Sequence, residues 1–446
     1  MAGTETAAPD VPSAQPSGPP SGPSGNGLAG PEGILRRQSL REPAARTYAR
    51  SLPIVPVRAR GLTIEGADGR RYLDCLSGAG TLALGHNHPV VLEAIKRVID
   101  SEAPLHASDL ASPVKDAFTT ELFAALPEAF ARDARIQFCG PADADALGAA
   151  LALVRSATGR DGLLTFAGAR QSTPYGSLRV TRLPYPRDYR SPFGTGGVRG
   201  AELAVRWTEE LLNDAEGPEP AAMLVEPLQC EGGVLPAPDG WLRRMRALTE
   251  ARSIPLVADE IDTGVGRTGA FWAVGPSGIV PDVLVLSKAV GGSLPLSVIV
   301  YRSALDEPRE TGPGGGRQAS RGNQLAMAAG AATLAYVREN RLDEHAATLG
   351  ARMLGRLREE TAALPCVGDV RGRGLMIGVE LTEPAQAAAV RQECLNRGLI
   401  VDVCGRHPGV VRLLPPLTLT EEQAAAVLDR FAEALAAVER AAETLG

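Results

Sequence analysis

Two charged side chains stand at the ends of two short apolar runs in the middle of the chain. The run Ile254 to Ala258 leads into Asp259, and the run Val283 to Leu286 leads through Ser287 into Lys288. Short runs rich in branched residues predict buried strands. Because ligands bind at the carboxyl ends of strands in an open α/β sheet, an acid and an amine at two such ends can meet in one site.

The chemistry that this pair favours is attack by the amine on a carbonyl group. Lys288 follows an apolar strand and precedes Gly291-Gly292, and partial burial at such a place favours a nucleophilic amine. Pyridoxal phosphate chemistry requires such a lysine together with an acid on the pyridinium nitrogen. The residues alone leave a second interpretation open, in which Lys288 is a solvated strand-end lysine and Asp259 caps a helix.

The stretch from Ile254 to Tyr301, with DEIDTGVGRTG and SKAVGG, resembles the signature of class III aminotransferases, which have fold type I and depend on pyridoxal phosphate. SGAGTLALGHNHP and SPVKDAF are similar to segments of the diaminobutyrate–2-oxoglutarate aminotransferases, and the resemblance runs from about Ile34 to the C-terminus. It implies that Lys288 forms the Schiff base with the cofactor and that Asp259 contacts the ring nitrogen. It also implies a homodimer, because the family's site is built at a subunit interface.

A strand, a turn and a helix start predict a phosphate site after Ala134 to Phe138. The segment CGPADAD follows, and then a helix to about Thr158. The first amides of a helix have no internal partners, and the helix dipole favours an anion there. The resemblance places Gly140, Asp143 and Ala144 at the cofactor phosphate, but the family has Gly-Thr where this chain has Asp143-Ala144. A carboxylate at this place stabilises the helix and repels a phosphate.

Other positions that the resemblance places at the cofactor also depart from the family. Arg170-Gln171 stand where the family has Tyr-His, whose aromatic residue covers the ring. Asp262 stands where it has Gln, and Ala319-Ser320 stand where it has Thr-Phe, the Thr reaching the neighbouring subunit's cofactor phosphate. The guanidinium of Arg170 can stack on a ring, whereas Asp262 cannot donate a hydrogen bond unless it is protonated.

A glutamate and an arginine are expected at the substrate end. Glu231 follows the apolar run Met223 to Glu226, and Arg412 lies in the segment VVRLLPP. In related ω-aminotransferases such a glutamate pairs with an arginine and releases it when a dicarboxylate arrives, and the resemblance gives these roles to Glu231 and Arg412. The fork of an arginine suits the task because it binds a carboxylate through two parallel bonds. The residues alone leave an ordinary surface glutamate and a strand arginine open.

Two functions are compatible with these observations. The first is pyridoxal-phosphate-dependent transamination of a diamino acid, expected to be L-2,4-diaminobutyrate, with 2-oxoglutarate, giving aspartate semialdehyde and glutamate. The second is an aminotransferase fold with altered or lost cofactor use, either a non-transaminase enzyme of specialised metabolism or a partner subunit. Lys288 and Asp259 favour the first, and the replacements at the phosphate favour the second. Diamino acids that differ by a methylene are weakly distinguished by one pocket, so the donor stays open.

Composition narrows the class of protein. The chain has 446 residues and a net charge of −6, with a pI near 5.6, so it lacks the basic surface that nucleic acid requires. No run approaches about eighteen apolar residues, and we expect a cytoplasmic protein that acts on small amino and oxo acids without contacting a membrane. The six cysteines show no CxxC spacing, and neither a zinc site nor a disulfide framework is predicted. His86 and His88 are interpreted as a turn and a helix start, not as metal ligands.

The expected fold class is α/β, a fold type I aminotransferase with a large, mostly parallel-sheet domain and a smaller α/β domain built from both chain ends. Residues 1–33 are rich in Pro, Gly, Ser and Ala and are predicted to be a disordered tail. Residues 34–85 are expected to be the N-terminal segment of the small domain, residues 86–335 the large cofactor-binding domain, and residues 336–446 the C-terminal small domain.

Overall fold

The computed structural model describes residues 30–42, 52–108, 110–169, 175–214, 217–306, 321–405 and 407–445. The chain divides into two units, one of residues 1–57 with 66–69 and one of residues 58–65 with 70–446. Most of the predicted tail lies outside the described residues. Its last residues, 31–33, belong to α1 (Pro31–Arg41), which Pro31 can begin because the first helical amide needs no partner.

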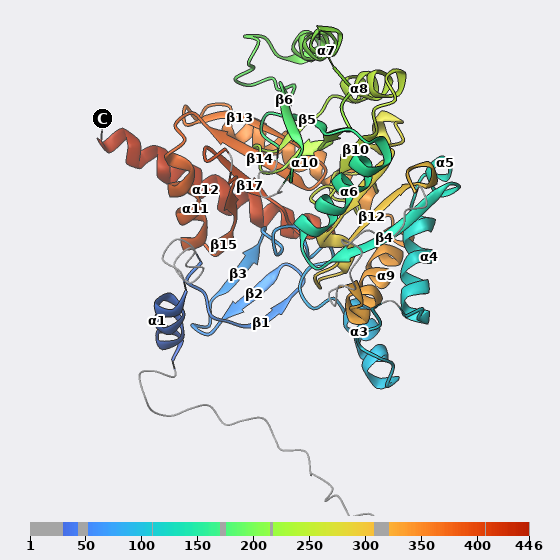
Figure 1. The fold of residues 1–446 in the computed structure, drawn as a ribbon. Coiled ribbons are helices and arrows are strands. Elements are labelled where there is room, and N and C mark those ends of the chain that lie inside the picture. Colours follow the sequence, from blue (N-terminus) through green and yellow to red (C-terminus); the bar gives the residue numbers. More distant parts are fainter. Residues whose placement is uncertain are drawn as a thin grey trace, which may run out of the picture. The chain divides into compact units, whose positions relative to one another are not determined.

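The second unit contains a seven-stranded sheet with the order β4-β12-β11-β10-β7-β5-β6 (Figure 1). Its strands are β4 (Ala134–Gly140), β5 (Gly162–Phe166), β6 (Arg179–Leu183), β7 (Ala222–Val225), β10 (Leu256–Asp259), β11 (Val283–Leu286) and β12 (Ser297–Arg302). β10 is parallel to β11 and β7, and β5 is parallel to β6 and β7. β12 is antiparallel to β11 and to β4, so β4 runs in the direction of β11. The predicted mostly parallel sheet is confirmed.

The central strands are apolar throughout because the sheet is covered on both faces. In β11, Val283 and Val285 share a core cluster with the apolar residues of α6 (Asp143–Thr158), whereas Leu284 and Leu286 belong to the larger cluster on the other face. Strands buried on both faces have continuous apolar sequences, which explains why β10 and β11 could be predicted from the sequence. Since all strands but β12 run the same way, their carboxyl ends share one edge of the sheet.

Helices pack on this sheet and, toward the C-terminus, on the smaller sheets. They are α3 (Pro89–Asp100), α4 (Pro113–Ala124), α5 (Glu128–Ala131), α7 (Gly197–Asp214), α8 (Asp239–Ala251), α9 (Gln324–Glu339), α10 (Leu342–Thr361), α11 (Gln386–Asn396) and α12 (Glu421–Leu445). α3 and α4 both pack on α9 (Figure 1), whose first turn is capped by the side chain of Asn323 accepting from the amide of Ala326 at 3.1 Å. Within the described residues, no helix combines the length and the apolarity that crossing a membrane requires.

Three smaller sheets complete the described structure. One has the order β1-β2-β3-β15, with β1 (Pro56–Arg60), β2 (Thr63–Gly66), β3 (Arg71–Asp74) and β15 (Leu399–Ile400). Another has the order β13-β14-β17-β16, with β13 (Val367–Arg373), β14 (Met376–Leu381), β17 (Val410–Leu413) and β16 (Asp402–Val403). The third pairs β8 (Leu228–Gln229) with β9 (Leu235–Pro236). β3 is parallel to β15, so strands from both chain ends share a sheet, as predicted. The predicted domain boundaries stay a prediction.

Candidate active site

Lys288 lies directly beyond β11, at the start of a short 3₁₀ helix, η3 (Lys288–Gly291). Its φ of +52° lies in the left-handed region, where a side chain is strained, and such positions concentrate at functional sites. The Nζ atom donates to the carbonyl of Ala79 at 3.1 Å and pairs with Oδ1 of Asp262 at 2.5 Å. The side chains of Lys288 and Asp262 are 13% and 6% exposed. The predicted amine is thus sheltered and paired with a carboxylate.

Asp259 ends β10, where it lies opposite Val285 in the register of β11. The residue is 4% exposed, and its Oδ1 atom accepts a hydrogen bond from the amide of Ile261 at 3.0 Å. This bond fixes the carboxylate at the strand end. Asp259 and Lys288 therefore come from the ends of adjacent parallel strands, as the sequence predicted.

The loop that carries Asp262 is held by another buried carboxylate, that of Glu260. It accepts hydrogen bonds from the amides of Ala273 at 2.7 Å and Val274 at 2.9 Å and from the hydroxyl of Thr263 at 3.1 Å. Burial raises the pKa of Glu260 to about 7, although these three hydrogen bonds act in the opposite direction. Sequence reasoning passed over Glu260, since its neighbour Asp259 carried the chemical signal.

The start of α6 follows β4 at the same edge of the sheet. Gly140 is buried at the end of β4, and its carbonyl accepts from the hydroxyl of Ser297 at 3.0 Å. Asp143 and Ala144 are partly exposed in the first turn of α6. The carboxylate of Asp145 accepts from the amide of Ala142 at 3.0 Å, so one amide of this helix start is already satisfied. Strand, turn and helix are confirmed as predicted.

Two predicted cofactor contacts fall outside the described residues. They are Arg170 and Ala319, with their neighbours Gln171 and Ser320. Their expected roles stay predictions.

The predicted pair at the substrate end is present. Nη1 of Arg412, on β17, lies 2.5 Å from Oε1 of Glu231, and the other oxygen of Glu231 accepts from the amide of Gly405 at 3.0 Å. Nη2 of Arg412 lies 2.8 Å from Oδ2 of Asp402. Sequence reasoning missed Asp402. In the structure, Asp402 on β16 lies directly opposite Arg412 on the antiparallel strand β17.

A buried thiol lies between the lysine and the arginine. Nη1 of Arg412 donates to Sγ of Cys230 at 3.3 Å. The pKa of Cys230 is raised to about 12, mainly by burial and then by the charge of Asp262, while the charges of Arg412 and Lys288 lower it. The Cys230 thiol, in contact with Arg412, therefore also lies within range of the charges of Lys288 and Asp262.

A pocket of about 290 Å³ opens beside this site. Its lining includes Gly168, which follows β5, and Gly232, which follows Glu231 in the chain. Arg187 and His407 add a guanidinium and an imidazole to its wall. The pocket gives the Glu231 segment an opening lined by polar groups.

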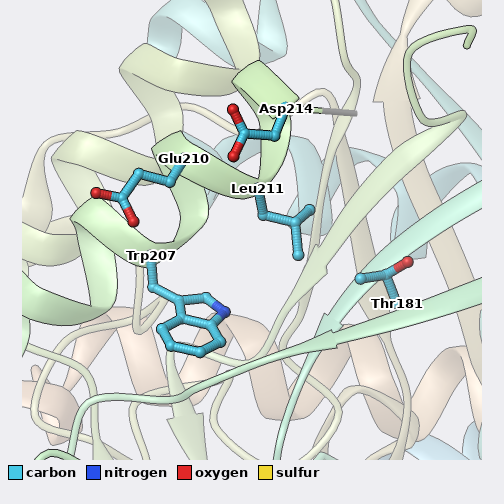
Figure 2. A pocket seen from close by; sticks show the side chains of 5 residues that line it. All are labelled: Thr181, Trp207, Glu210, Leu211 and Asp214. Atoms are coloured by element: carbon cyan, nitrogen blue, oxygen red, sulfur yellow. The ribbon is translucent and has the colours of Figure 1, made fainter. Parts of the chain in front are cut away.

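A separate pocket of about 430 Å³ lies on α7 and β6, and Figure 2 shows its lining. Trp207, Glu210, Leu211 and Asp214 of α7 surround the opening, with Thr181 of β6 across from them. Trp207 is 53% exposed. The lining contains none of the predicted site residues, so this pocket is not part of the candidate active site.

The two histidines near the N-terminal strands have structural contacts. Nε2 of His86 lies 2.8 Å from Oδ2 of Asp74, and His88 precedes the first residue of α3 with its ring centroid 4.7 Å from that of Tyr336. The predicted turn and helix start are confirmed. Across the part of the chain that the structure describes, three or more His, Cys, Asp or Glu side chains do not gather into a possible metal site.

The arrangement fits pyridoxal phosphate at its reactive end. A lysine amine and a buried carboxylate come from adjacent strand ends, as a carbonyl cofactor with a ring nitrogen requires. The fit is weaker at the phosphate end, where Asp143 adds negative charge to the first turn of α6 and Ala144 offers no hydroxyl.

Comparisons with known proteins agree with this arrangement. The model of the family "Aminotransferase class-III" matches residues 44–435. The chain is 44% identical over 436 residues to the diaminobutyrate–2-oxoglutarate aminotransferase of Rhizobium meliloti (strain 1021), covering 90% of this chain and 91% of that protein. It is 38% identical to a protein of the same name from Haemophilus influenzae, covering 92% of this chain and 96% of the relative.

Solved structures show the same fold. An amine transaminase from an uncultivated Pseudomonas species, in its PLP-bound internal aldimine form, is 27% identical with a TM-score of 0.79, covering 88% of this chain and 97% of that chain. An ornithine aminotransferase from Toxoplasma gondii ME49 is 25% identical with a TM-score of 0.77, covering 93% and 97%. Both likenesses extend over nearly the whole chain.

Proposed function

Because this chain belongs to the class III aminotransferases, we propose that it transfers the ω-amino group of L-2,4-diaminobutyrate to 2-oxoglutarate, giving aspartate semialdehyde and glutamate. The observation that carries the proposal is the placement of Lys288 and Asp259 at the ends of adjacent parallel strands. The names of the relatives that match over most of the chain support the choice of donor and acceptor. The comparisons favour this function over a fold with altered or lost cofactor use.

Pyridoxal phosphate is the cofactor that the family implies. When bound, it supplies an electron sink for the charge that develops as a proton leaves the substrate carbon. Lys288 would hold it through Nζ, Asp259 would contact its ring nitrogen, and Gly140 with the start of α6 would receive its phosphate.

The proton is carried by Nζ of Lys288. In the resting site this amine is held by Oδ1 of Asp262 and the carbonyl of Ala79. As an ammonium paired with Asp262, Nζ has no lone pair, so it must lose a proton and leave this ion pair before it can act as a base. Its low exposure keeps bulk water away from the proton during transfer.

The acceptor is bound by Arg412. Its guanidinium keeps its charge throughout, so it can exchange one carboxylate for another without a proton transfer. When Glu231 leaves Nη1, a carboxylate of 2-oxoglutarate takes its place. Donor and acceptor therefore use the same site in turn. The donor binds while Glu231 contacts Arg412, and the acceptor binds when Glu231 is displaced.

The proposal includes a cytoplasmic homodimer. Its support is the family resemblance, which puts the position of Ala319 next to the neighbouring subunit's cofactor phosphate. Sedimentation of the purified chain as a single species of twice the monomer mass is the expected result.

The test combines absorbance with product formation. Purified protein mixed with pyridoxal phosphate should develop a visible absorbance band, and Lys288→Ala should not. Lys96→Ala, at an exposed lysine of α3, is the control and should behave as wild type. Glutamate should form from 2-oxoglutarate when L-2,4-diaminobutyrate is present. A folded protein without the band would contradict the cofactor assignment, and a band without glutamate would contradict the substrates.

A further inference from the structure

Arg412 is held by two carboxylates at the same time. Glu231 binds Nη1 at 2.5 Å and Asp402 binds Nη2 at 2.8 Å. With both carboxylates ionised, the three side chains together carry a net negative charge. A guanidinium paired with Glu231 alone would form a neutral unit. Asp402 therefore changes the sign of the electrostatic environment that a ligand meets at this end of the site.

We propose that Asp402 sets the preference of the site for charged ligands. This inference rests on the proposed transamination. Asp402 stays on Nη2 of Arg412 while Glu231 leaves Nη1. With Glu231 in contact, the cluster is negative and favours an amino donor with a second ammonium group. With Glu231 displaced, Arg412 and Asp402 form a neutral pair that accepts the far carboxylate of the acceptor.

The backbone explains why Asp402 is the fixed partner. β16 and β17 are antiparallel neighbours, and Asp402 lies opposite Arg412 in their register. Cross-strand side chains at such positions are held close together by the sheet itself. Glu231 follows the short strand β8, outside this sheet, and its second oxygen is held by the amide of Gly405. Its longer side chain can rotate away once that bond and the bond to Nη1 are exchanged.

The cluster is accessible to a substrate on its carboxylate side. The side chains of Glu231 and Asp402 are 24% and 30% exposed, whereas that of Arg412 is 6% exposed. Nε of Arg412 is buried and, among the described residues, has no hydrogen-bond acceptor. A buried donor without an acceptor is costly, so this arginine has unused capacity for a further anion.

Removal of the charge at Asp402 should change the KM values of the two substrates in opposite directions. In Asp402→Asn the cluster is neutral with Glu231 in contact and positive with Glu231 displaced. The KM for L-2,4-diaminobutyrate should rise about tenfold, and the KM for 2-oxoglutarate should fall about tenfold, because one charge is lost close to each bound group. If Asp402 had only a structural role, its replacement would weaken the binding of both substrates or lower kcat alone.

The donor itself provides a chemical control. 4-Aminobutyrate has the same reacting amine and carboxylate as L-2,4-diaminobutyrate but lacks the second ammonium group. The rise in donor KM caused by Asp402→Asn should therefore be absent for 4-aminobutyrate. An equal rise for both donors would overturn the proposal.

Further variants separate charge from shape. Asp402→Ser is a second neutral variant and should reproduce the changes seen for Asp402→Asn, whereas Asp402→Glu keeps the charge and should retain the wild-type ratio of the two KM values. Asp429→Asn removes one of two carboxylates from Arg356, an exposed arginine on α10, and should change neither KM. KM values that move in the same direction, or do not move, in both neutral variants would overturn the proposal.

Equilibrium binding distinguishes a failure of this inference from a failure of the proposed function. Titration calorimetry with glutarate, a dicarboxylate that cannot react, should show about tenfold tighter binding to Asp402→Asn than to wild type. If wild type forms no glutamate from the two substrates, the proposed function fails while this measurement still tests Asp402. If turnover is present but glutarate binds both proteins equally, the inference fails and the proposed function stands.

Discussion

The site holds two sheltered cations in different ways. Lys288 pairs with Asp262 and donates to a backbone carbonyl, whereas Arg412 is shared between Glu231 and Asp402. The lysine is the group that must give up its proton to react, so every carboxylate on it opposes the chemistry. The arginine keeps its proton, so additional carboxylates change only which ligands it accepts. Lys288 is therefore the cation that reacts, and Arg412 is the cation that selects which ligand binds.

The two clusters also differ in how the fold positions them. Asp262 lies in the turn beyond β10 and Lys288 at the start of the short 3₁₀ helix beyond β11, at the edge of a sheet whose strands are buried on both faces. Arg412 and Asp402 lie within paired strands of a smaller sheet. A loop can move to release an ion pair, whereas a strand register holds one in place. The thiol of Cys230 contacts Arg412, and the charges of both clusters act on its pKa.

The largest effect is expected for Arg412→Lys. A lysine keeps the charge but loses the planar fork, so it cannot hold Asp402 and an incoming carboxylate with the same geometry. The preference for 2-oxoglutarate over pyruvate, measured as the ratio of their kcat/KM values, should fall about 10²-fold. Arg356→Lys is the matched control, since Arg356 is also shared between two carboxylates, Glu360 and Asp429. An unchanged ratio in Arg412→Lys would show that the acceptor is held elsewhere.

The sequence predicted the large sheet well because its strands are buried on both faces. β10 and β11 read as apolar runs, and their parallel pairing followed from the α/β pattern. The antiparallel insertion of β12 between β11 and β4 could not be predicted, since its residues, also apolar, do not encode strand direction. Strand direction is decided by the connections and by packing against α6.

The sequence pointed to individual candidate residues and to one pairing between them, but not to their other partners. Glu231 and Arg412 were expected to pair, and they do. Asp262 was expected at the ring of the cofactor, which stays a prediction, and its pairing with Lys288 was not foreseen. Asp402 was missed because two-residue strands such as β16 give almost no periodic signal. Interactions between residues far apart in the chain depend on loop geometry, which the order of residue types does not encode.

The Lys288 cluster can be tested by removing its carboxylate. In Asp262→Gln the amine loses its ion pair, and the side chain regains the amide that the family has at this position. The rate at which the visible band appears after addition of pyridoxal phosphate should rise about tenfold, because a smaller part of the lysine is held as a paired ammonium. Stopped-flow absorbance measures this rate directly.

Asp161→Asn is the control for this experiment. Asp161 pairs with Arg179 at 2.8 Å on the exposed surface, and 47% of its side chain is exposed. Its replacement should leave the loading rate unchanged. A loading rate that falls in Asp262→Gln would mean that Asp262 assists the lysine, and the contrast between a reacting and a selecting cation would not hold.

A further effect, on stability and not on activity, concerns Glu260, the carboxylate that holds the loop carrying Asp262 through backbone amides. Its pKa is raised by burial from 4.5 to about 7. A raised pKa means that the folded state binds the proton more tightly than the unfolded state does. The stability that this proton contributes is present in full below about pH 4.5 and is lost as the pH rises through about 7. The free energy of unfolding should therefore fall by about 2 kcal/mol from Glu260 alone between pH 5 and pH 7.5.

Glu260→Gln separates this contribution from other titrating groups. The glutamine cannot ionise, so the difference in unfolding free energy between wild type and the variant should change with pH by that amount. Urea unfolding of both proteins at several pH values gives the difference. Glu339→Gln, at an exposed residue of α9, should show a constant difference from wild type. Parallel curves for wild type and Glu260→Gln would mean that the buried carboxylate is ionised throughout, stabilised by its two amides and one hydroxyl.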